Sequence, residues 1–216
     1  VLIFNWLYFE EMLSENRTAN NRQEEVVKIA QQMQETSDSL AYLVRNYVFT
    51  GDIQYFEDYW SMELHGEGRE DVVKKLRSYH FDNEEHKNLN IILDRCDELK
   101  KQEVYAMWLA LAQYHVHAID YADEELQGYI RYVENYDKLP MHEDRNEPVM
   151  GQKQDAIDYL SGEEYSYCTQ QLFNAIDEFV SQEQNKLDNI AQQNRSISNR
   201  AILFQGMCII LVIVCI

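Results

Sequence analysis

The most informative chemical feature of this sequence is a glutamate on an otherwise apolar helical stripe. Glu103 follows Leu89, Ile92, Cys96 and Leu99 at steps of three and four residues, which is the spacing of one helix face. A carboxylate on such a face must find a cation, water or a ligand, because burying it unpaired is costly. The pattern therefore marks Glu103 as the first candidate for a functional site.

Residue counts along the expected helices bring four further side chains to the height of Glu103. At a rise of about 1.5 Å per residue, we expect one layer made of Arg45, Tyr59, Trp60, Glu103 and Tyr165. One interpretation is structural: Arg45 and Glu103 form a salt bridge, or Glu103 faces a solvated notch. The other is a ligand pocket, in which Arg45 holds a carboxylate as a two-pronged fork and the aromatic side chains close around the ligand. Glu103 would then be free to face a ligand ammonium.

No pattern in the sequence indicates catalysis, a metal or a cofactor. Cys/His clusters, CxxC pairs, glycine-rich phosphate loops, HExxH and nucleophile-elbow motifs are all missing from the sequence. His115 and His117 are two apart, so on a helix they point in different directions. His142, Glu143 and Asp144 are more typical of a solvated acidic loop than of a metal site. We therefore expect a protein that is not an enzyme, with no catalytic residue, no metal and no cofactor.

Two polar or reactive features on the predicted seams have structural explanations. Cys96 and Cys168 fall at similar heights on helices expected to be antiparallel. We expect two buried free thiols there, with a disulfide as the alternative outside the cytoplasm. Glu183 interrupts the seam of the last helix, where a polar residue can fix the register of the packing.

Composition narrows the class of protein. The chain has 216 residues and a formal charge of -19, from 38 acidic and 19 basic side chains. Such an excess argues against binding nucleic acid or an anionic lipid surface, and is otherwise typical of a solvated face. Only 7 glycines and 2 prolines occur, in a chain rich in helix-forming residues. These features predict an all-α fold.

Capping and breaking signals divide the helices. The first helix is expected to end near Phe49, where Gly51 can adopt the left-handed conformation and Asp52 can cap the second helix. Glycines 66 and 68 should loosen that second helix. A capping box from Asp82 to Glu85 predicts the start of the third helix, which continues with or without a break to Val133.

The second half of the sequence contains one long loop and one long helix. Residues 138–151 are predicted as the loop, and residues 152–160 as a short helical turn that ends near Gly162. The last helix should run from Glu163 into the C-terminal apolar segment. Its sequence has no proline or glycine before Gly206, so it can transmit a displacement without a hinge.

Apolar segments at both ends, residues 1–9 and 201–216, suggest the truncated ends of two transmembrane helices, since a span needs roughly 20 apolar residues. We therefore expect a fragment of a larger membrane protein, with residues 10–200 as an extracytoplasmic domain that includes an insert at about 115–154. The fold expected is an antiparallel up-down four-helix bundle whose long first and last helices continue into the membrane. The regular seams on these helices also favour a parallel homodimer.

The stretch from Leu40 to Trp60, LAYLVRNYVFTGDIQYFEDYW, resembles the extracytoplasmic helical-bundle sensor domains of bacterial chemoreceptors, sensor histidine kinases and membrane diguanylate cyclases. Further resemblance lies in Arg69-Glu70, Asp97-Glu98-Leu99 and Gly162-Glu163-Glu164-Tyr165. The patches cover roughly residues 10 to 200 in order, and the chain departs from the family at about 115–154. The resemblance implies a sensor module in a cell membrane.

From this resemblance we expect a chemoreceptor domain that binds a small molecule and signals through its last helix. The ligand would be an amino acid, an organic acid or an amine. Two alternatives remain open. The same module could drive a histidine kinase or a diguanylate cyclase, or it could bind no small molecule and serve in dimerisation or protein docking.

Overall fold

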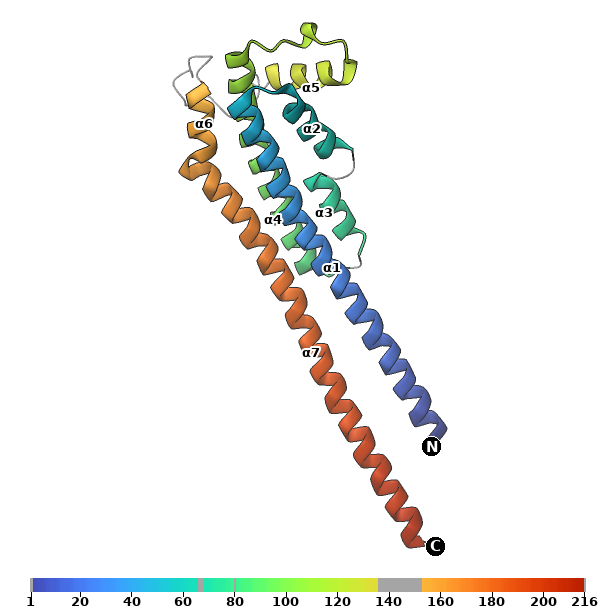
Figure 1. The fold of residues 1–216 in the computed structure, drawn as a ribbon. Helices are drawn as coiled ribbons and strands as arrows, with labels where there is room; N and C mark the ends of the chain where they lie inside the picture. Colours follow the sequence, from blue (N-terminus) through green and yellow to red (C-terminus); the bar gives the residue numbers. More distant parts are fainter. Residues whose placement is uncertain (1, 66–67, 80, 136–152, 216) are drawn as a thin grey trace. The chain divides into compact units, whose positions relative to one another are not determined.

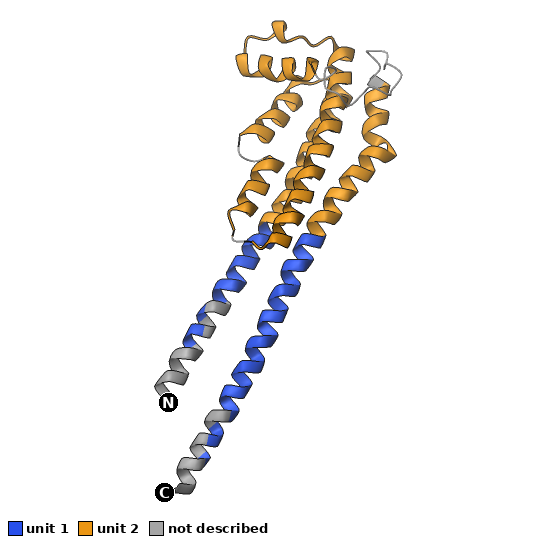
Figure 2. Ribbon diagram, turned by 180° about the vertical axis from the view of Figure 1, so that it is seen from behind, with its two compact units in different colours: residues 1–28, 178–216 blue, residues 29–177 orange. Residues whose placement is uncertain are grey.

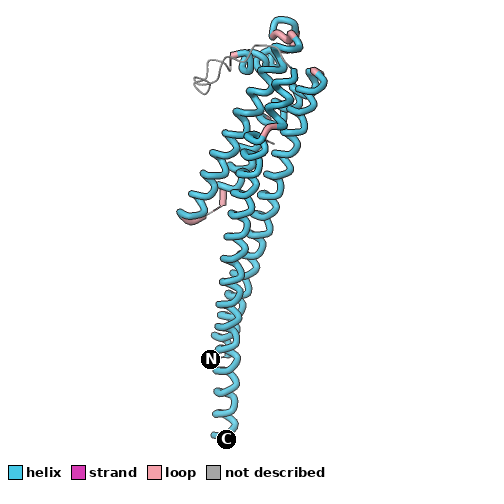
Figure 3. Tube along the Cα trace, turned by 90° about the vertical axis from the view of Figure 1, so that its left-hand side faces the viewer, coloured by secondary structure: helices cyan, strands magenta, loops and turns pink. Residues whose placement is uncertain are grey.

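The structure is a computed structural model that describes residues 2–65, 68–79, 81–135 and 153–215. Every regular element in these ranges is helical (Figures 1 and 3). In chain order they are α1 (Leu2–Thr50), α2 (Ile53–Leu64), α3 (Arg69–Arg77), α4 (Asn83–Tyr114), the 3-10 turn η1 (Ala118–Asp120), α5 (Glu124–Glu134), α6 (Lys153–Ser161) and α7 (Glu163–Cys215). The predicted loop at 138–151, with His142, Glu143 and Asp144, lies outside the described residues.

The boundary between α1 and α2 forms as the sequence predicts. Gly51 has a φ of 72°, the left-handed conformation that glycine adopts without strain, and its N–H donates to the Tyr47 carbonyl at 2.8 Å. The Asp52 side chain accepts a hydrogen bond from the Gln54 N–H at 3.0 Å and so caps α2. The chain therefore reverses direction within two residues.

The start of α4 also follows the sequence signal. Asp82 Oδ1 accepts hydrogen bonds from the N–H groups of Glu84 and Glu85, each at 2.9 Å, and the Glu85 carboxylate accepts from the Asp82 N–H. This is the predicted capping box. The short helix and the long last helix are likewise present as α6 and α7, with Gly162 between them.

Helix α4 ends at Tyr114, well before Val133, the latest end that the sequence left open. His115 adopts a left-handed conformation with a φ of 54°, and the Val116 N–H donates back to the Leu111 carbonyl at 3.1 Å. The chain then forms η1 and a separate helix, α5, which Asp123 caps by accepting from the Leu126 N–H at 2.8 Å. The structure thus resolves the open question of the third helix in favour of a break.

The described chain forms two compact units (Figure 2). Residues 29–177 make the larger unit, in which α2 and α3 follow one another along α4 (Figure 1). Its buried apolar side chains include Leu40 and Val44 of α1 and Leu172 and Ile176 of α7. The prediction of an all-α helical bundle with long first and last helices packed together is confirmed. Its four-helix form stays a prediction.

Residues 1–28 and 178–216 make the other unit, which contains only parts of α1 and α7. Glu183 is 7% exposed there, on the seam position where the sequence places it. Among the residues that the structure describes, no helix has a stretch both long and apolar enough to cross a membrane. The membrane attachment of residues 1–9 and 201–216 stays a prediction.

Candidate functional site

A buried ion pair occupies the centre of the larger unit. The guanidinium of Arg69 grips the carboxylate of Glu103 through two hydrogen bonds, from Nη1 to Oε2 and from Nη2 to Oε1, each 2.7 Å long. The two side chains are 1% and 0% exposed. Such a planar, two-pronged pair is the strongest form of an arginine–carboxylate contact.

Three more side chains complete the hydrogen bonding of this pair. The Tyr59 hydroxyl donates to Glu103 Oε2 at 3.0 Å, and the Tyr165 hydroxyl donates to Oε1 at 3.2 Å. The Arg69 Nε donates to Ser37 Oγ at 3.1 Å. We call these five side chains, Ser37, Tyr59, Arg69, Glu103 and Tyr165, the buried polar layer. They come from α1, α2, α3, α4 and α7 respectively.

The electrostatics of the layer keep its donors protonated at neutral pH. Burial alone would lower the pKa of Arg69, but the adjacent Glu103 carboxylate more than offsets this, so the pKa lies above its ordinary value. The pKa values of Tyr59 and Tyr165 are raised by burial first and by the Glu103 charge second. Both phenols therefore remain neutral donors.

The entry of the chain into α3 directs Arg69 inward. Gly68 precedes Arg69 at the N-cap of α3, in an extended conformation. A Cβ atom on Gly68 would lie 2.3 Å from the Glu63 carbonyl oxygen, so this close approach requires glycine. The apolar side chains of α3, Val72, Val73 and Leu76, are buried on the same side of the helix as Arg69. Local sequence and packing together bring the guanidinium to Glu103.

Of the five predicted site residues, three meet directly. Tyr59, Glu103 and Tyr165 share hydrogen bonds in the buried polar layer. Trp60 lies beside it, with its ring centroid 5.3 Å from that of Tyr59. Arg45 is exposed, and its guanidinium carbon lies 5.6 Å from the centroid of the Tyr165 ring. For all five of these residues, the role in ligand binding stays a prediction.

The predicted salt bridge between Arg45 and Glu103 is wrong, because Arg69 is the partner of Glu103. Arg69 and Ser37 are the members of the layer that sequence reasoning missed. A signal for each was present. Ser37 falls on the seam of the first helix, and Arg69 lies three and seven residues before Val72 and Leu76, at helical spacing. If the apolar stripe of α3 is followed one turn toward its N-terminus, it predicts that Arg69 lies on the buried face.

Trp60 connects the layer to α5. Its ring stacks on Tyr129, at a centroid distance of 5.8 Å and an interplanar angle of 19°, and meets Tyr132 edge-on at 5.1 Å. The Lys100 ammonium lies 5.9 Å from the Trp60 centroid and forms an ion pair with Glu63 at 3.0 Å. Helix α5 thus packs on α2 mainly through aromatic side chains.

Cys96 and Cys168 are free thiols, as predicted, but only Cys96 is buried; Cys168 is half-buried, so that part of the prediction is wrong. Cys168 Sγ accepts a hydrogen bond from Gln102 Nε2 at 2.8 Å. Burial raises the pKa of the Cys96 thiol to about 12, so it is an unreactive apolar side chain at neutral pH.

The arrangement can do little acid–base or metal chemistry. The carboxylate of Glu103 accepts four hydrogen bonds and is fully enclosed. Within the described ranges, no group of three or more His, Cys, Asp or Glu side chains is placed to hold a metal ion. What the layer can do is fix how the helices align along their axes, since each bond fails if its helix slides by 1–2 Å, in order of magnitude.

Comparison of the chain with models of protein families, with curated proteins and with solved structures finds no match.

Proposed function

We propose that this chain is the extracytoplasmic sensor module of a bacterial transmembrane receptor, of the chemoreceptor type. It acts as a homodimer anchored in the membrane through both ends, and it transmits a signal through α7. Support comes from the family resemblance in the sequence and from the buried polar layer. The output could equally be a histidine kinase or a diguanylate cyclase, because these receptors share one kind of sensor module.

The single observation that carries the proposal is the bond from Tyr165 of α7 to Glu103 of α4 at 3.2 Å. It ties the last helix to a carboxylate that Arg69 and Tyr59 also hold. A buried ion pair adds little net stability compared with apolar packing, and its best-attested use is to specify register. A layer of this kind has discrete arrangements, which is what a signalling element needs.

Helix α7 suits the transmission of such a change. It runs from Glu163 to Cys215 as one α-helix and begins directly before the layer residue Tyr165. A stimulus that favours one alignment of α2 or α3 against α4 changes which bonds the Glu103 carboxylate makes. The size of the signal equals the difference in affinity of the stimulus for the two alignments.

A hybrid receptor tests this function. Residues 10–200 would replace the sensor domain of a chemoreceptor whose kinase output is measurable in membranes. We expect Tyr165→Phe to shift the basal kinase activity, because the bond to Glu103 is lost. Tyr167→Phe is the matched control, since Tyr167 is 63% exposed two residues further on. Unchanged output in both hybrids, at normal membrane levels, would refute a signalling role for the layer.

The location can be tested separately. Asn83→Cys puts a thiol at an exposed position at the start of α4. We expect a membrane-impermeant maleimide to label it in intact cells that carry the full-length receptor. Labelling only after the cells are permeabilised would place the domain in the cytoplasm and contradict the proposal.

One observation favours a protein-docking function as the second candidate. The larger unit exposes apolar side chains around η1 and α5, namely Ile119 at 86% and Tyr132 at 51%. Exposed apolar residues are typical of protein interaction sites where they form a contiguous patch, and these two lie on consecutive elements of the chain. In this case the stimulus is a bound protein instead of a small molecule. Ile119→Ser in the hybrid receptor separates the two, since it should abolish only a response that depends on protein docking.

A further inference from the structure

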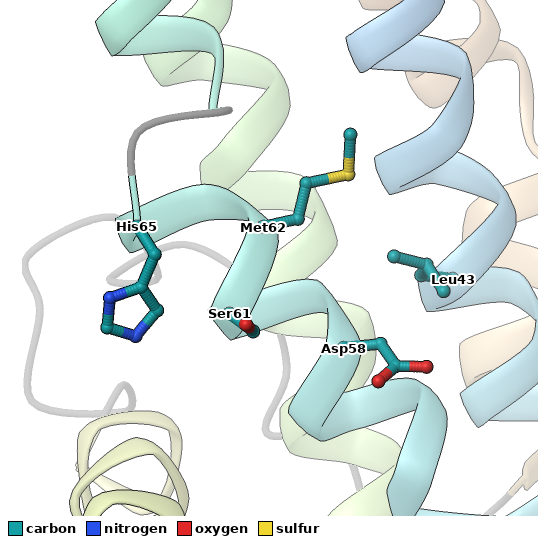
Figure 4. A pocket seen from close by; sticks show the side chains of 5 residues that line it. All are labelled: Leu43, Asp58, Ser61, Met62 and His65. Atoms are coloured by element: carbon teal, nitrogen blue, oxygen red, sulfur yellow. The ribbon is translucent and has the colours of Figure 1, made fainter.

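An open pocket lies on the surface of the larger unit, where α2 faces α1. Its volume is about 430 Å³, and its lining residues are Leu43, Asp58, Ser61, Met62 and His65 (Figure 4). Asp58, Ser61 and Met62 lie on α2 and His65 is its C-cap residue, and their spacings of three and four residues place them on one face of that helix. Leu43 forms the wall on α1. The volume falls within the range of roughly 300–1,000 Å³ that is usual for small-molecule sites.

The lining combines one anionic group with apolar surface. Figure 4 shows the Leu43 side chain pointing toward α2 and the Asp58 carboxylate pointing toward α1, with Ser61 and Met62 further along α2. The Asp58 carboxylate accepts one hydrogen bond, from Gln54 Nε2 at 2.9 Å. A carboxylate has about four acceptor positions, so it retains capacity for a ligand donor. No lysine or arginine is among the five lining residues.

The far end of the pocket is fixed by contacts to α5. His65 Nε2 lies 2.7 Å from Glu125 Oε1 and 3.2 Å from the Tyr129 hydroxyl oxygen. Glu125 therefore places a second carboxylate just beyond His65. With a formal chain charge of -19, the surroundings favour a cation over an anion or a neutral molecule.

We propose that this pocket binds an organic cation, a primary ammonium that carries an apolar body. The ammonium donates to Asp58 and to the Ser61 hydroxyl, and the apolar body packs against Met62 and Leu43. The site shares no residue with the buried polar layer, and the inference does not depend on the proposed signalling function. Binding would still occur if the chain proved not to be a receptor.

The first experiment is calorimetric titration of the 216-residue chain with 2-phenylethylamine at neutral pH. The neutral 2-phenylethanol and the anionic phenylacetate serve as comparison ligands of nearly the same shape. We expect the amine to bind with a Kd below ~1 mM and both comparison ligands to bind about two- to fivefold more weakly, the factor that one exposed charge pair gives. Absence of binding at ~10 mM amine, or equal affinity for all three, overturns the proposal.

A matched pair of variants tests whether Asp58 is the carboxylate that binds the ammonium. Asp58→Asn removes the pocket carboxylate, and Asp94→Asn removes an exposed carboxylate from α4 with the same change in net charge. We expect Asp58→Asn to weaken amine binding about two- to fivefold and Asp94→Asn to leave it unchanged. Equal effects of the two variants would show a non-specific attraction to the acidic surface and refute the site.

Methyl NMR of methionine-labelled protein locates the ligand. The Met62 methyl, assigned with Met62→Leu, lines the pocket, whereas Met107 is fully buried in α4. We expect the amine to shift the Met62 resonance and to leave that of Met107 in place. Saturable binding without a change at Met62 would mean that the amine binds elsewhere.

Discussion

Arg69 and Glu103 join two helices through a pair of 2.7 Å hydrogen bonds, and neither side chain is more than 1% exposed. Both charged groups are shut off from water. The attraction between them is therefore the main compensation for the hydration that each has lost. The energetic consequences are asymmetric. Removing one partner leaves a buried unpaired charge, whereas removing both leaves a space that apolar side chains can fill.

We predict that Glu103→Ala lowers the free energy of unfolding by about 3–5 kcal/mol, because Arg69 is then buried without its carboxylate. The double variant Arg69→Met with Glu103→Leu should recover most of that loss. Urea denaturation measures both. Glu98→Ala is the control, since its ion pair with Arg95 is partly exposed and should contribute less than about 1 kcal/mol. A double variant as unstable as Glu103→Ala would contradict the prediction.

The two arginines near Tyr165 should behave very differently. Arg69→Ala removes the buried partner of Glu103 and should destabilise the fold by about 3–5 kcal/mol. Arg45→Ala removes only an exposed guanidinium that lies 5.6 Å from the Tyr165 ring centroid, a contact of about 0.5–1 kcal/mol. Thermal and urea unfolding distinguish them. Similar losses for both variants would show that Arg45 also compensates Glu103.

Two glycine substitutions should have opposite signs. Gly51 has a φ of 72°, and a Cβ atom there would lie 2.6 Å from the Tyr114 ring. Gly51→Ala should therefore cost at least about 1–2 kcal/mol of stability. Gly128→Ala, inside α5 with no atom within 4 Å of the added Cβ, should stabilise by up to about 1 kcal/mol. The melting temperatures of the two variants check the signs, and a stabilising Gly51→Ala would contradict the left-handed turn.

Alkaline pH should unfold the protein partly through Cys96. Burial raises the pKa of its thiol from 9.0 to about 12. Well below pH 9 the thiol is protonated in both the folded and the unfolded chain and has no effect on the pH dependence of stability. Between these values the unfolded chain loses a proton that the folded chain keeps, so the free energy of unfolding falls as pH rises.

The measurement for Cys96 is the urea midpoint at several pH values from 8 to 11. Cys96→Ala should make its decline with pH less steep than in the parent chain. Cys168→Ala should reduce the decline less, since Cys168 is only half-buried. Parallel curves for Cys96→Ala and the parent would show that the buried tyrosines, whose pKa values are also raised, account for the whole decline.

The sequence alone was sufficient for the local structure. Gly51 and Asp52 determine where α1 ends and α2 begins, and the box from Asp82 to Glu85 starts α4. These signals are reliable because each acts within three residues, through the backbone groups that a helix end leaves unpaired. The shared height of Tyr59, Glu103 and Tyr165 was also predictable, since rise per residue is constant along an unbroken helix.

Only the tertiary structure determined which arginine meets Glu103. Counting along a helix fixes height but not rotation about the axis once the helix is broken, and α2 and α3 are separate helices. The close approach of Gly68 to the Glu63 carbonyl sets the direction of α3 and turns Arg69 inward, while Arg45 remains at the surface. The end of α4 is a second feature that only the tertiary structure determined. His115 adopts the left-handed conformation there, and the sequence has no glycine at that position from which the end could be predicted. Contacts between distant segments govern both features, and local propensity does not encode them.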